Sequence, residues 1–393
     1  MQLIPKYIHF IYTVITLLMI YILSPIKEYE SGVFVGVMIC GVAMSLMFPK
    51  TFFSAHNARI FKVVYGILLL NVCYQFILGW LSIKPHDWLY LLAKYGTSSV
   101  VVVAIVKNPD FYIKSAYKYL ACLIALMLLF GWASAETDEI TGRFTFGFGN
   151  SNATGSVAAF AFAVFLIKPD IWKGVRLSGL FISLAAVMIC GSRTGIVLLL
   201  MSFFFKYKLN YKLIFGGLAF LVVIVWVLPK FGVELTAIDR IVDTYDPETE
   251  TFITNRDTEQ DAGLLMFYNK FWTGYGLSAY RIVDFDLLPY YVEYLAGTHN
   301  GYLCAAKTYG IIGLLLFIGI NFFRAFYLLK HYFKSENPDI CLHLFVTCGV
   351  LVAAVAEDYL MGINSIITIL FFTSISCLEY MDYFHQRMKP MNM

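Results

Sequence analysis

The chain has 393 residues, of which 60% are hydrophobic and 14% are charged, with a formal net charge of +3. A soluble domain is about half apolar and about a quarter charged, so a soluble fold of this length has too little interior for so much apolar surface. The hydrocarbon of a bilayer accepts such surface in stretches of about 20 residues. We therefore expect a membrane protein, with lipid as its surroundings and no nucleic-acid partner.

Twelve apolar runs with short polar breaks predict about twelve transmembrane helices. Only helices and closed barrels satisfy backbone polar groups in lipid, and these runs are longer than barrel strands and lack their alternation. The runs cover residues 8–24, 32–48, 60–82, 88–106, 116–134, 153–167, 177–192, 194–206, 213–229, 302–325, 340–356 and 364–383. The fold class is therefore an all-α polytopic membrane protein, and its first run is read as a retained helix, not as a cleaved signal peptide.

The distribution of Lys and Arg predicts the orientation of these helices. The N-terminus, the C-terminal tail and the loops after helices 2, 4, 6, 8 and 10 hold most of the basic residues. The short loops of the opposite parity hold only Lys27, Lys84, Arg143 and Arg193. By the positive-inside rule, both termini are expected to be cytoplasmic.

A long acidic loop separates the ninth run from the tenth. We divide one integrated membrane domain into residues 1–229, an extracytoplasmic loop 230–300 and residues 301–393, because a loop of this length is more than a connector. The stretch DTEQDAGLLMFYNKF after Arg256 has helical spacing of its apolar residues Leu264, Leu265, Phe267, Tyr268 and Phe271. It predicts an amphipathic helix that packs on the membrane domain or lies at the interface.

Four segments on the outer face contain residues suited to binding an anion or moving a proton. Arg193 lies in a turn flanked by Gly191 and Gly195, and a guanidinium matches phosphate oxygens. His299 precedes the tenth helix, and its imidazole suits a general base. The other candidates in these segments are Arg143, Asn150, Asn152, Arg256, Arg281 and Asn300.

Each of these segments also has an ordinary structural explanation. Arg193 can anchor a helix end by snorkelling, and Asn150 or Asn152 can cap a helix. Arginines in an acidic loop can pair with carboxylates, and a lone His at an interface is more often a hydrogen-bonding residue. The functional reading depends on the arginines of three of these segments and the histidine of the fourth meeting on one face.

Other polar residues give weaker indications. All eight cysteines lie in apolar runs without a CxxC pair or a His/Cys cluster, so we expect neither a disulfide framework nor a metal site. Lys94 and Lys307 lie inside apolar runs, where a charge is costly and often functional. Either lysine can line a cavity or simply snorkel, and the sequence leaves that choice open.

At these positions the chain resembles the bacterial O-antigen ligase and polymerase superfamily. His299-Asn300, nine residues, Gly310, two residues and Gly313 resemble that family's His-Asn motif, which begins a helix after a large periplasmic loop. Ser192 to Gly195 resembles its Ser-Arg motif. The Gly-Phe-Gly-Asn-x-Asn run up to Asn152 is similar to the family's outer turn. Arg256 and the Gly274-Tyr275-Gly276 turn resemble its loop-helix Arg and the Gly-x-Gly that follows. The likeness covers about residues 140 to 320.

The resemblance implies a metal-independent glycosyltransferase of the bacterial inner membrane, without a cofactor, whose donor is a glycan on undecaprenyl pyrophosphate. In that reading His299 activates the acceptor hydroxyl, and Arg193 assists catalysis. Arg143, Arg256 and Arg281, with Asn150, Asn152, Asn300 and Tyr275, bind the pyrophosphate or the glycan. The large loop is periplasmic, and a chain-length regulator protein is a further expected partner.

Within the superfamily the Phe-Gly-Asn-x-Asn segment and the short N-terminal part favour a polymerase of the Wzy type. The alternative is the O-antigen ligase, which transfers the glycan to the core sugars of lipid A. A polysaccharide or lipid transporter is a third hypothesis, but transporters bind substrate near the bilayer midplane, between internal repeats. Here the polar residues gather on one face and no repeat is visible. The sugar, the linkage and the oligomeric state stay open.

Overall fold

The structure, a computed structural model, describes residues 3–22, 30–77, 85–134, 137, 143–208, 245–246, 251–252, 257–277, 298–362 and 365–388. These residues are almost entirely helical, which confirms the all-α expectation. The helices of the N-terminal half are α1 (Ile4–Ile22), α2 (Glu30–Met47), α3 (Pro49–Phe52), α4 (Ala55–Ile60), α5 (Lys62–Ile77), α6 (Pro85–Lys107), α7 (Pro109–Lys114) and α8 (Ala116–Ser134). The remaining helices are α9 (Ser151–Ile167), α10 (Lys173–Ile189), α11 (Arg193–Tyr207), α14 (Asp257–Asn269), α15 (Gly301–Tyr332), α16 (Pro338–Ala353) and α17 (Ile366–Met388). One short antiparallel pair, β1 (Tyr245–Asp246) with β2 (Thr251–Phe252), lies in the long loop.

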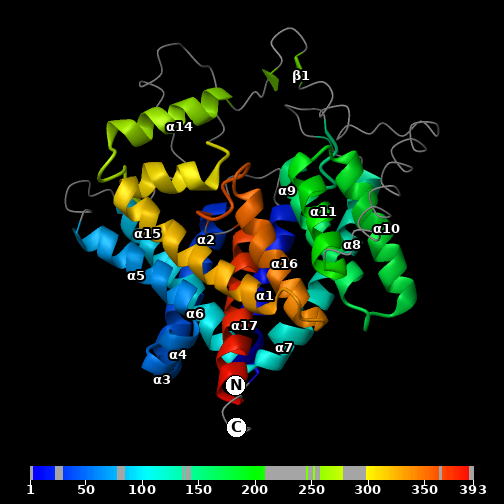
Figure 1. Cartoon of the computed structure of the whole chain (residues 1–393), viewed down its shortest axis with the longest axis horizontal. Helices are drawn as coiled ribbons and strands as arrows, with labels where there is room; N and C mark the ends of the chain where they lie inside the picture. The colour runs from blue at the N-terminus through cyan, green and yellow to red at the C-terminus, as the bar shows by residue number, and fades with distance from the viewer. Residues whose placement is uncertain are drawn as a thin grey trace.

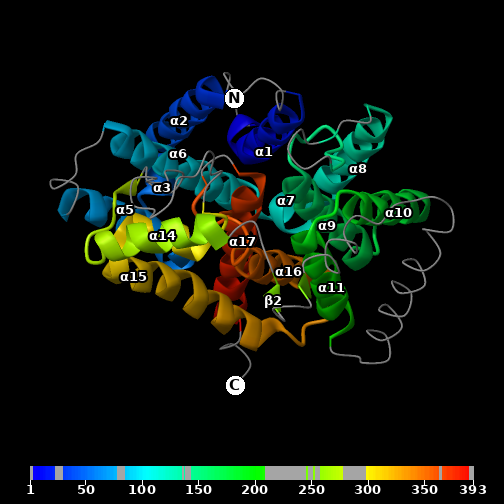
Figure 2. The same cartoon turned by 90° about the horizontal axis from the view of Figure 1, so that it is seen from above.

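Helix α17 lies at the centre of the bundle and packs against α1, α5, α6, α15 and α16 (Figures 1 and 2). One group of helices, α2, α5 and α6, lies on one side of it, and a second group, α8 to α11, lies on the other. The start of α1 and the end of α17 are found at the bottom of Figure 1, whereas α14 covers the opposite end. The two ends of the bundle therefore differ: one holds the terminal helix ends and the other holds the loop helix.

Several apolar helices indicate an integral membrane protein. Within the described residues, five helices (α1, α6, α8, α15 and α17) are long and apolar enough to cross a membrane, or six if the bent pair Pro49–Ile60 and Lys62–Ile77 forms one span. Helices α9 and α16 are apolar but shorter, with 17 and 16 residues. Twelve spans remain a prediction, because run 213–229 and most of the loop 230–300 lie outside the described residues.

The loop helix α14 confirms the helix expected after Arg256, and the structure shows which of its faces packs on the bundle. The side that packs on the bundle holds Ala262, Gly263 and Met266, whereas Leu264 and Tyr268 are exposed. The reason is close approach: a Cβ at Gly263 would overlap the side chain of Thr298 just before α15. Small residues let α14 lie directly across the start of α15, whereas Leu264, Leu265 and Tyr268 are exposed.

Helix α15 is broken at Gly310, whose φ of 68° and ψ of −173° are not helical. The segment that follows α14 supplies partners for the freed backbone groups. The amide of Tyr275 donates to the carbonyl of Lys307 (2.8 Å), and the amide of Ile311 donates to the carbonyl of Phe271 (2.8 Å). Backbone away from regular helix is tolerated at membrane depth only where protein or water satisfies it.

Glycines make this pairing sterically accessible. Gly274 and Gly276 have φ values of 65° and 105°, in the left-handed region that side chains avoid. A Cβ at Gly274 would overlap the carbonyl of Thr308, which accepts hydrogen bonds from the amide of Gly276 (3.2 Å) and the hydroxyl of Tyr74 (2.8 Å). The Gly-x-Gly turn therefore packs directly against the backbone of α15 at the Gly310 break.

We predict that Gly274→Ala destabilises the folded protein. The left-handed backbone disfavours a side chain by about 1–2 kcal/mol, and the overlap with Thr308 adds to that cost. The apparent melting temperature in detergent should fall by at least about 2–4 °C. Gly36→Ala is the control, because no atom lies within 4 Å of a Cβ at this exposed helix position. Equal melting temperatures for the two variants would contradict the contact.

Candidate functional site

The N-termini of α9 and α11 lie against each other at the loop-helix end of the bundle. Asn150 caps α9 by accepting hydrogen bonds from the amides of Asn152 and Ala153, and Ser192 caps α11 by accepting from the amide of Gly195. Gly155 leaves room for Ser192, because a Cβ at Gly155 would overlap that side chain. The capping role considered for Asn150 from the sequence is thus observed, and the caps of the two helices lie close together.

Arg143 joins these two caps. Its Nη1 donates to Oδ1 of Asn152 (3.3 Å) and to the carbonyl of Gly191 (3.4 Å), and the residue is only 9% exposed. Arg193 is the first residue of α11 and half-buried, next to the turn that Arg143 contacts. Four of the expected site residues, Arg143, Asn150, Asn152 and Arg193, therefore form one group, whose dipoles and cations favour an anion.

Cys190 lies in the same turn but does not suit a nucleophile. The thiol is fully buried. A buried cysteine in apolar surroundings is inert, because the thiolate is the reactive form. Chemistry at this turn therefore depends on its cations and amides.

His299 is held between two carboxylates at the start of α15. Its Nε2 lies 3.5 Å from Oε2 of Glu259 on α14, and its Nδ1 lies 3.6 Å from Oε2 of Glu357. The imidazole is 24% exposed, so a ligand can reach it from outside. The backbone of His299 has a φ of 42°, unusual for a residue with a side chain. Two carboxylates stabilise the protonated ring electrostatically.

The start of α15 is fixed to the connection between α16 and α17. Asn300 caps the helix by accepting from the amides of Tyr302 and Leu303, both at 3.0 Å. The amide of Gly301 donates to the carbonyls of Ala354 (2.7 Å) and Glu357 (3.0 Å). The His299-Asn300-Gly301 sequence therefore starts α15, and the amide of Gly301 binds the segment that contains Glu357.

One buried hydrogen bond connects the two groups of residues. The hydroxyls of Ser156 and Tyr359 lie 2.8 Å apart, and Ser156 Oγ also donates to the carbonyl of Asn152 (3.0 Å). Ser156 belongs to the first turns of α9, and Tyr359 follows Glu357 by two residues. The arginine group and the histidine group therefore lie at the same end of the bundle.

The remaining expected residues are not all near His299. Arg256 and Arg281 lie outside the described residues. Tyr275 lies at the Gly-x-Gly turn, where Nδ2 of Asn269 donates to its hydroxyl (2.7 Å) and Nζ of Lys270 lies 4.5 Å from its ring centroid. Its amide pairs with Lys307, about 9 Å along the axis from the start of α15. A role for Tyr275 in binding glycan stays a prediction.

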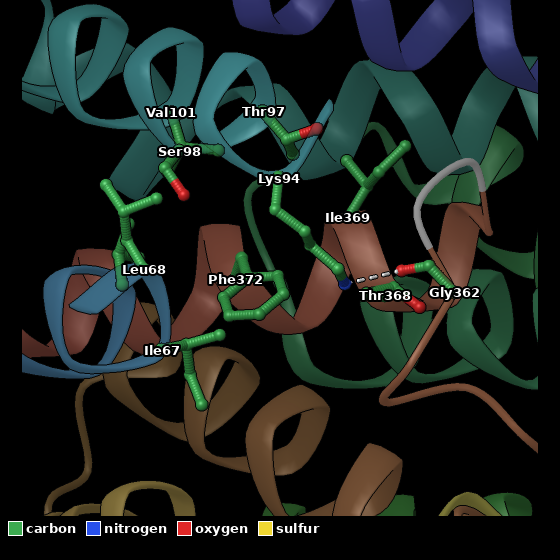
Figure 3. A pocket seen from close by; sticks show the side chains of 11 residues that line it. Ile67, Leu68, Lys94, Thr97, Ser98, Val101, Gly362, Thr368, Ile369 and Phe372 are labelled. Atoms are coloured by element: carbon green, nitrogen blue, oxygen red, sulfur yellow. Dashed lines mark hydrogen bonds between the residues drawn. The ribbon is translucent and has the colours of Figure 1, made fainter. Parts of the chain in front are cut away.

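Lys94 lies in a small pocket between α5, α6 and α17 (Figure 3). Its Nζ donates to the carbonyl of Gly362 (3.0 Å) and lies 5.8 Å from the ring centroid of Phe372. The neighbouring Tyr90 donates to the carbonyl of Met361 (2.5 Å). Lys94 is only 7% exposed, so it does not snorkel but anchors the far end of the connection that carries Glu357.

Lys307 is completely buried directly before the break in α15. Its carbonyl accepts from Tyr275, and Cys304 and Asp358 are near enough to interact with its ammonium group. The same connection thus faces both lysines that the sequence left open, Lys94 through Gly362 and Lys307 through Asp358. Both lysines occupy the interior of the bundle next to the candidate site.

Sequence reasoning missed the connection altogether. Glu357 and Tyr359 come at the end of an apolar run, where their polarity predicted only a helix end, and Glu259 was one acidic residue among many in the loop. The available signal was Glu357-Asp358, a pair of acids between two apolar runs, at the end expected to face outward. Its meaning required the tertiary contact with His299.

These observations define an integral membrane protein with a polar site at one end of a helical bundle. Residues 178–318 match the family model Wzy_C, described as O-antigen ligase. The match contains both Arg193 and His299, and it confirms the resemblance to the O-antigen ligase and polymerase superfamily, whose members are membrane glycosyltransferase-like enzymes. No curated protein sequence matches the chain.

We predict an energetic coupling between Ser156 and Tyr359. A double-mutant cycle with Ser156→Ala and Tyr359→Phe should return about 0.5–1.5 kcal/mol, because the two hydroxyls form one buried hydrogen bond. Unfolding in mixed micelles monitored by circular dichroism measures it. Ser202→Ala paired with Tyr359→Phe is the control, since Ser202 bonds within its own helix. Additive effects for the Ser156 pair would contradict the connection.

Proposed function

We propose that the chain is a glycosyltransferase that moves a glycan from undecaprenyl pyrophosphate to an acceptor hydroxyl on the outer face of the bacterial inner membrane. The observation that supports this most is the arrangement of His299 between two carboxylates, at the same end as the arginine group and two capped helix N-termini. The family match over residues 178–318 supports the same class of reaction.

In the proposed reaction His299 acts as the general base. Its imidazole takes the proton of the acceptor hydroxyl while the acceptor oxygen bonds to the anomeric carbon of the donor. The bond from that carbon to the pyrophosphate breaks, and the leaving pyrophosphate keeps the electron pair. Positioned base catalysis contributes about 10²–10⁴-fold to rates of this kind.

Arg143 and Arg193, with the amides at the starts of α9 and α11, would stabilise the leaving pyrophosphate. Charge grows on that group in the transition state, and fixed cations and dipoles in a partly dry site act on it strongly. Arg256 and Arg281 belong to the proposal as further anion-binding residues. Asn150 and Asn152 have side-chain oxygens engaged as acceptors in the cap and with Arg143, so their part is to shape this anion site.

We favour a polymerase, which transfers the growing glycan to the next lipid-linked repeat unit and is regulated by a chain-length partner. The ligase is the second candidate, because the matching family model carries that description. The two enzymes share the donor and differ in the acceptor. The orientation with cytoplasmic termini and a periplasmic loop is part of this proposal, and it agrees with the opposite placement of the terminal helix ends and α14 (Figure 1).

We predict that His299→Ala and Arg193→Ala each lower transfer by at least about 100-fold in purified protein given a polyprenyl-pyrophosphate-linked glycan. Size-exclusion profile and circular dichroism should match the wild type. His385→Ala and Arg59→Ala are the controls, because both side chains are exposed on helices at the other end of the bundle. Full activity in His299→Ala would refute the role of the base, and a wild type that only moves the lipid across vesicles would indicate a transporter.

Deletion of the gene tests which acceptor the enzyme uses, and we predict the phenotype of a polymerase. Loss of a polymerase leaves lipid A-core carrying a single repeat unit, since ligation continues without chain growth. Loss of a ligase leaves core without any attached glycan, and the polymer accumulates on its lipid carrier. Gel electrophoresis of the lipopolysaccharide distinguishes these patterns, with the plasmid-borne gene as control. Unattached long chains in the deletion strain would contradict the polymerase assignment.

A further inference from the structure

The two carboxylates beside His299 are not equivalent, although their distances from the ring are similar. Glu357 lies on the segment whose carbonyl accepts the amide of Gly301, two residues after His299. Its carboxylate is 8% exposed, and Tyr90 and Lys94 hold the same connection further along. Glu357 therefore belongs to the same rigid unit as the imidazole. Glu259 comes from α14, a helix of the large loop that lies across this unit.

The positions of the two carboxylates indicate which ring nitrogen carries the proton and which one is basic. A neutral imidazole carries one proton, and a carboxylate opposite Nδ1 favours the tautomer with the proton on that nitrogen. Nε2 is then the basic nitrogen. Glu259 faces Nε2, so an acceptor hydroxyl has to replace the Glu259 carboxylate there in order to deliver its proton.

We propose that Glu357 is the positioning residue of His299, holding the Nδ1–H of the imidazole so that Nε2 receives the proton of the acceptor hydroxyl. This inference rests on the proposed transferase function. During transfer the acceptor O–H bond breaks, its proton bonds to Nε2, and the ring becomes an imidazolium with its charge facing the Glu357 carboxylate. The proton then leaves Nε2 to water or to the departed pyrophosphate, which restores the neutral ring.

The charged groups around His299 come from three elements. Glu259 on α14 and Glu357 on the connection face the ring, and Asp261 and Asp358 are the next acids on those elements. Lys307 is the first charged residue along α15 and is completely buried. Glu357 is the group that combines contact with Nδ1 and a backbone bond to the start of α15.

The test is the pH dependence of transfer by purified Glu357→Gln. Without the carboxylate the imidazole orients poorly, so kcat should fall roughly 10- to 100-fold, within the contribution of a general base, while KM for the acceptor changes little. The negative charge that favours the imidazolium is also lost. His299 then becomes neutral at lower pH, and the acidic limb of kcat/KM against pH moves to lower pH by about half a unit or more.

Two variants serve as comparisons. Asp358→Asn removes the same charge one residue away and should keep both the rate and the acidic limb of the wild type. Glu259→Gln should lower kcat less than Glu357→Gln, because the acceptor displaces Glu259 from Nε2. If Glu357→Gln fails to fold, Glu357→Asp is measured instead, and its shortened side chain should lower kcat with a smaller move of the limb.

The possible outcomes distinguish a failure of the role of Glu357 from a failure of the proposed transferase function. Inactive wild-type protein, or full activity in His299→Ala, removes the transferase proposal itself. An active wild type and an inactive His299→Ala, combined with a Glu357→Gln enzyme whose pH profile is unchanged, overturn the role of Glu357 alone. A uniform loss of rate at every pH would show only a structural contribution. A larger loss in Glu259→Gln than in Glu357→Gln would reverse the two carboxylates and likewise overturn the assignment.

Discussion

Backbone polar groups that leave a helix inside a membrane protein must find partners within the protein, because lipid offers none. The broken helix α15 shows how this chain meets that constraint. The carbonyls of Lys307 and Thr308, released by the break at Gly310, accept amides from the Tyr275–Gly276 segment. In return the amide of Ile311 reaches the carbonyl of Phe271. The loop segment from Phe271 to Gly276 is thus hydrogen-bonded into the helical bundle.

The same constraint explains why the candidate site lies where irregular segments meet. The turn before α9, the turn between α10 and α11, the start of α15 and the connection to α17 all depart from regular helix. Hydrogen bonds join these segments: Arg143 donates to the carbonyl of Gly191, and Gly301 donates to that of Glu357. Tyr359 on the connection bonds to Ser156 in the first turns of α9. Helix starts present free amides, and their partners bring cations and carboxylates with them.

The buried Lys94 has a structural role, because it fixes the connection between α16 and α17. Lys94 donates to the carbonyl of Gly362, and Tyr90 donates to that of Met361, so α6 secures the distal part of the connection. The proximal part is secured by Gly301 at the start of α15. A connection fastened at both ends can hold Glu357 at a constant position relative to His299, which a mobile loop could not do.

The sequence alone determined the helical class, because long apolar runs leave no other way to satisfy backbone groups in lipid. It also made Arg143, Arg193 and His299 candidates for the site, since their residue types and the neighbouring glycines and asparagines are visible along the chain. The partners Glu259 and Glu357, the packing face of α14 and the pairing of Gly274 with α15 were decided only by tertiary structure. Those contacts join residues from distant parts of the chain, and hydrophobic periodicity reports burial but does not specify which segments meet.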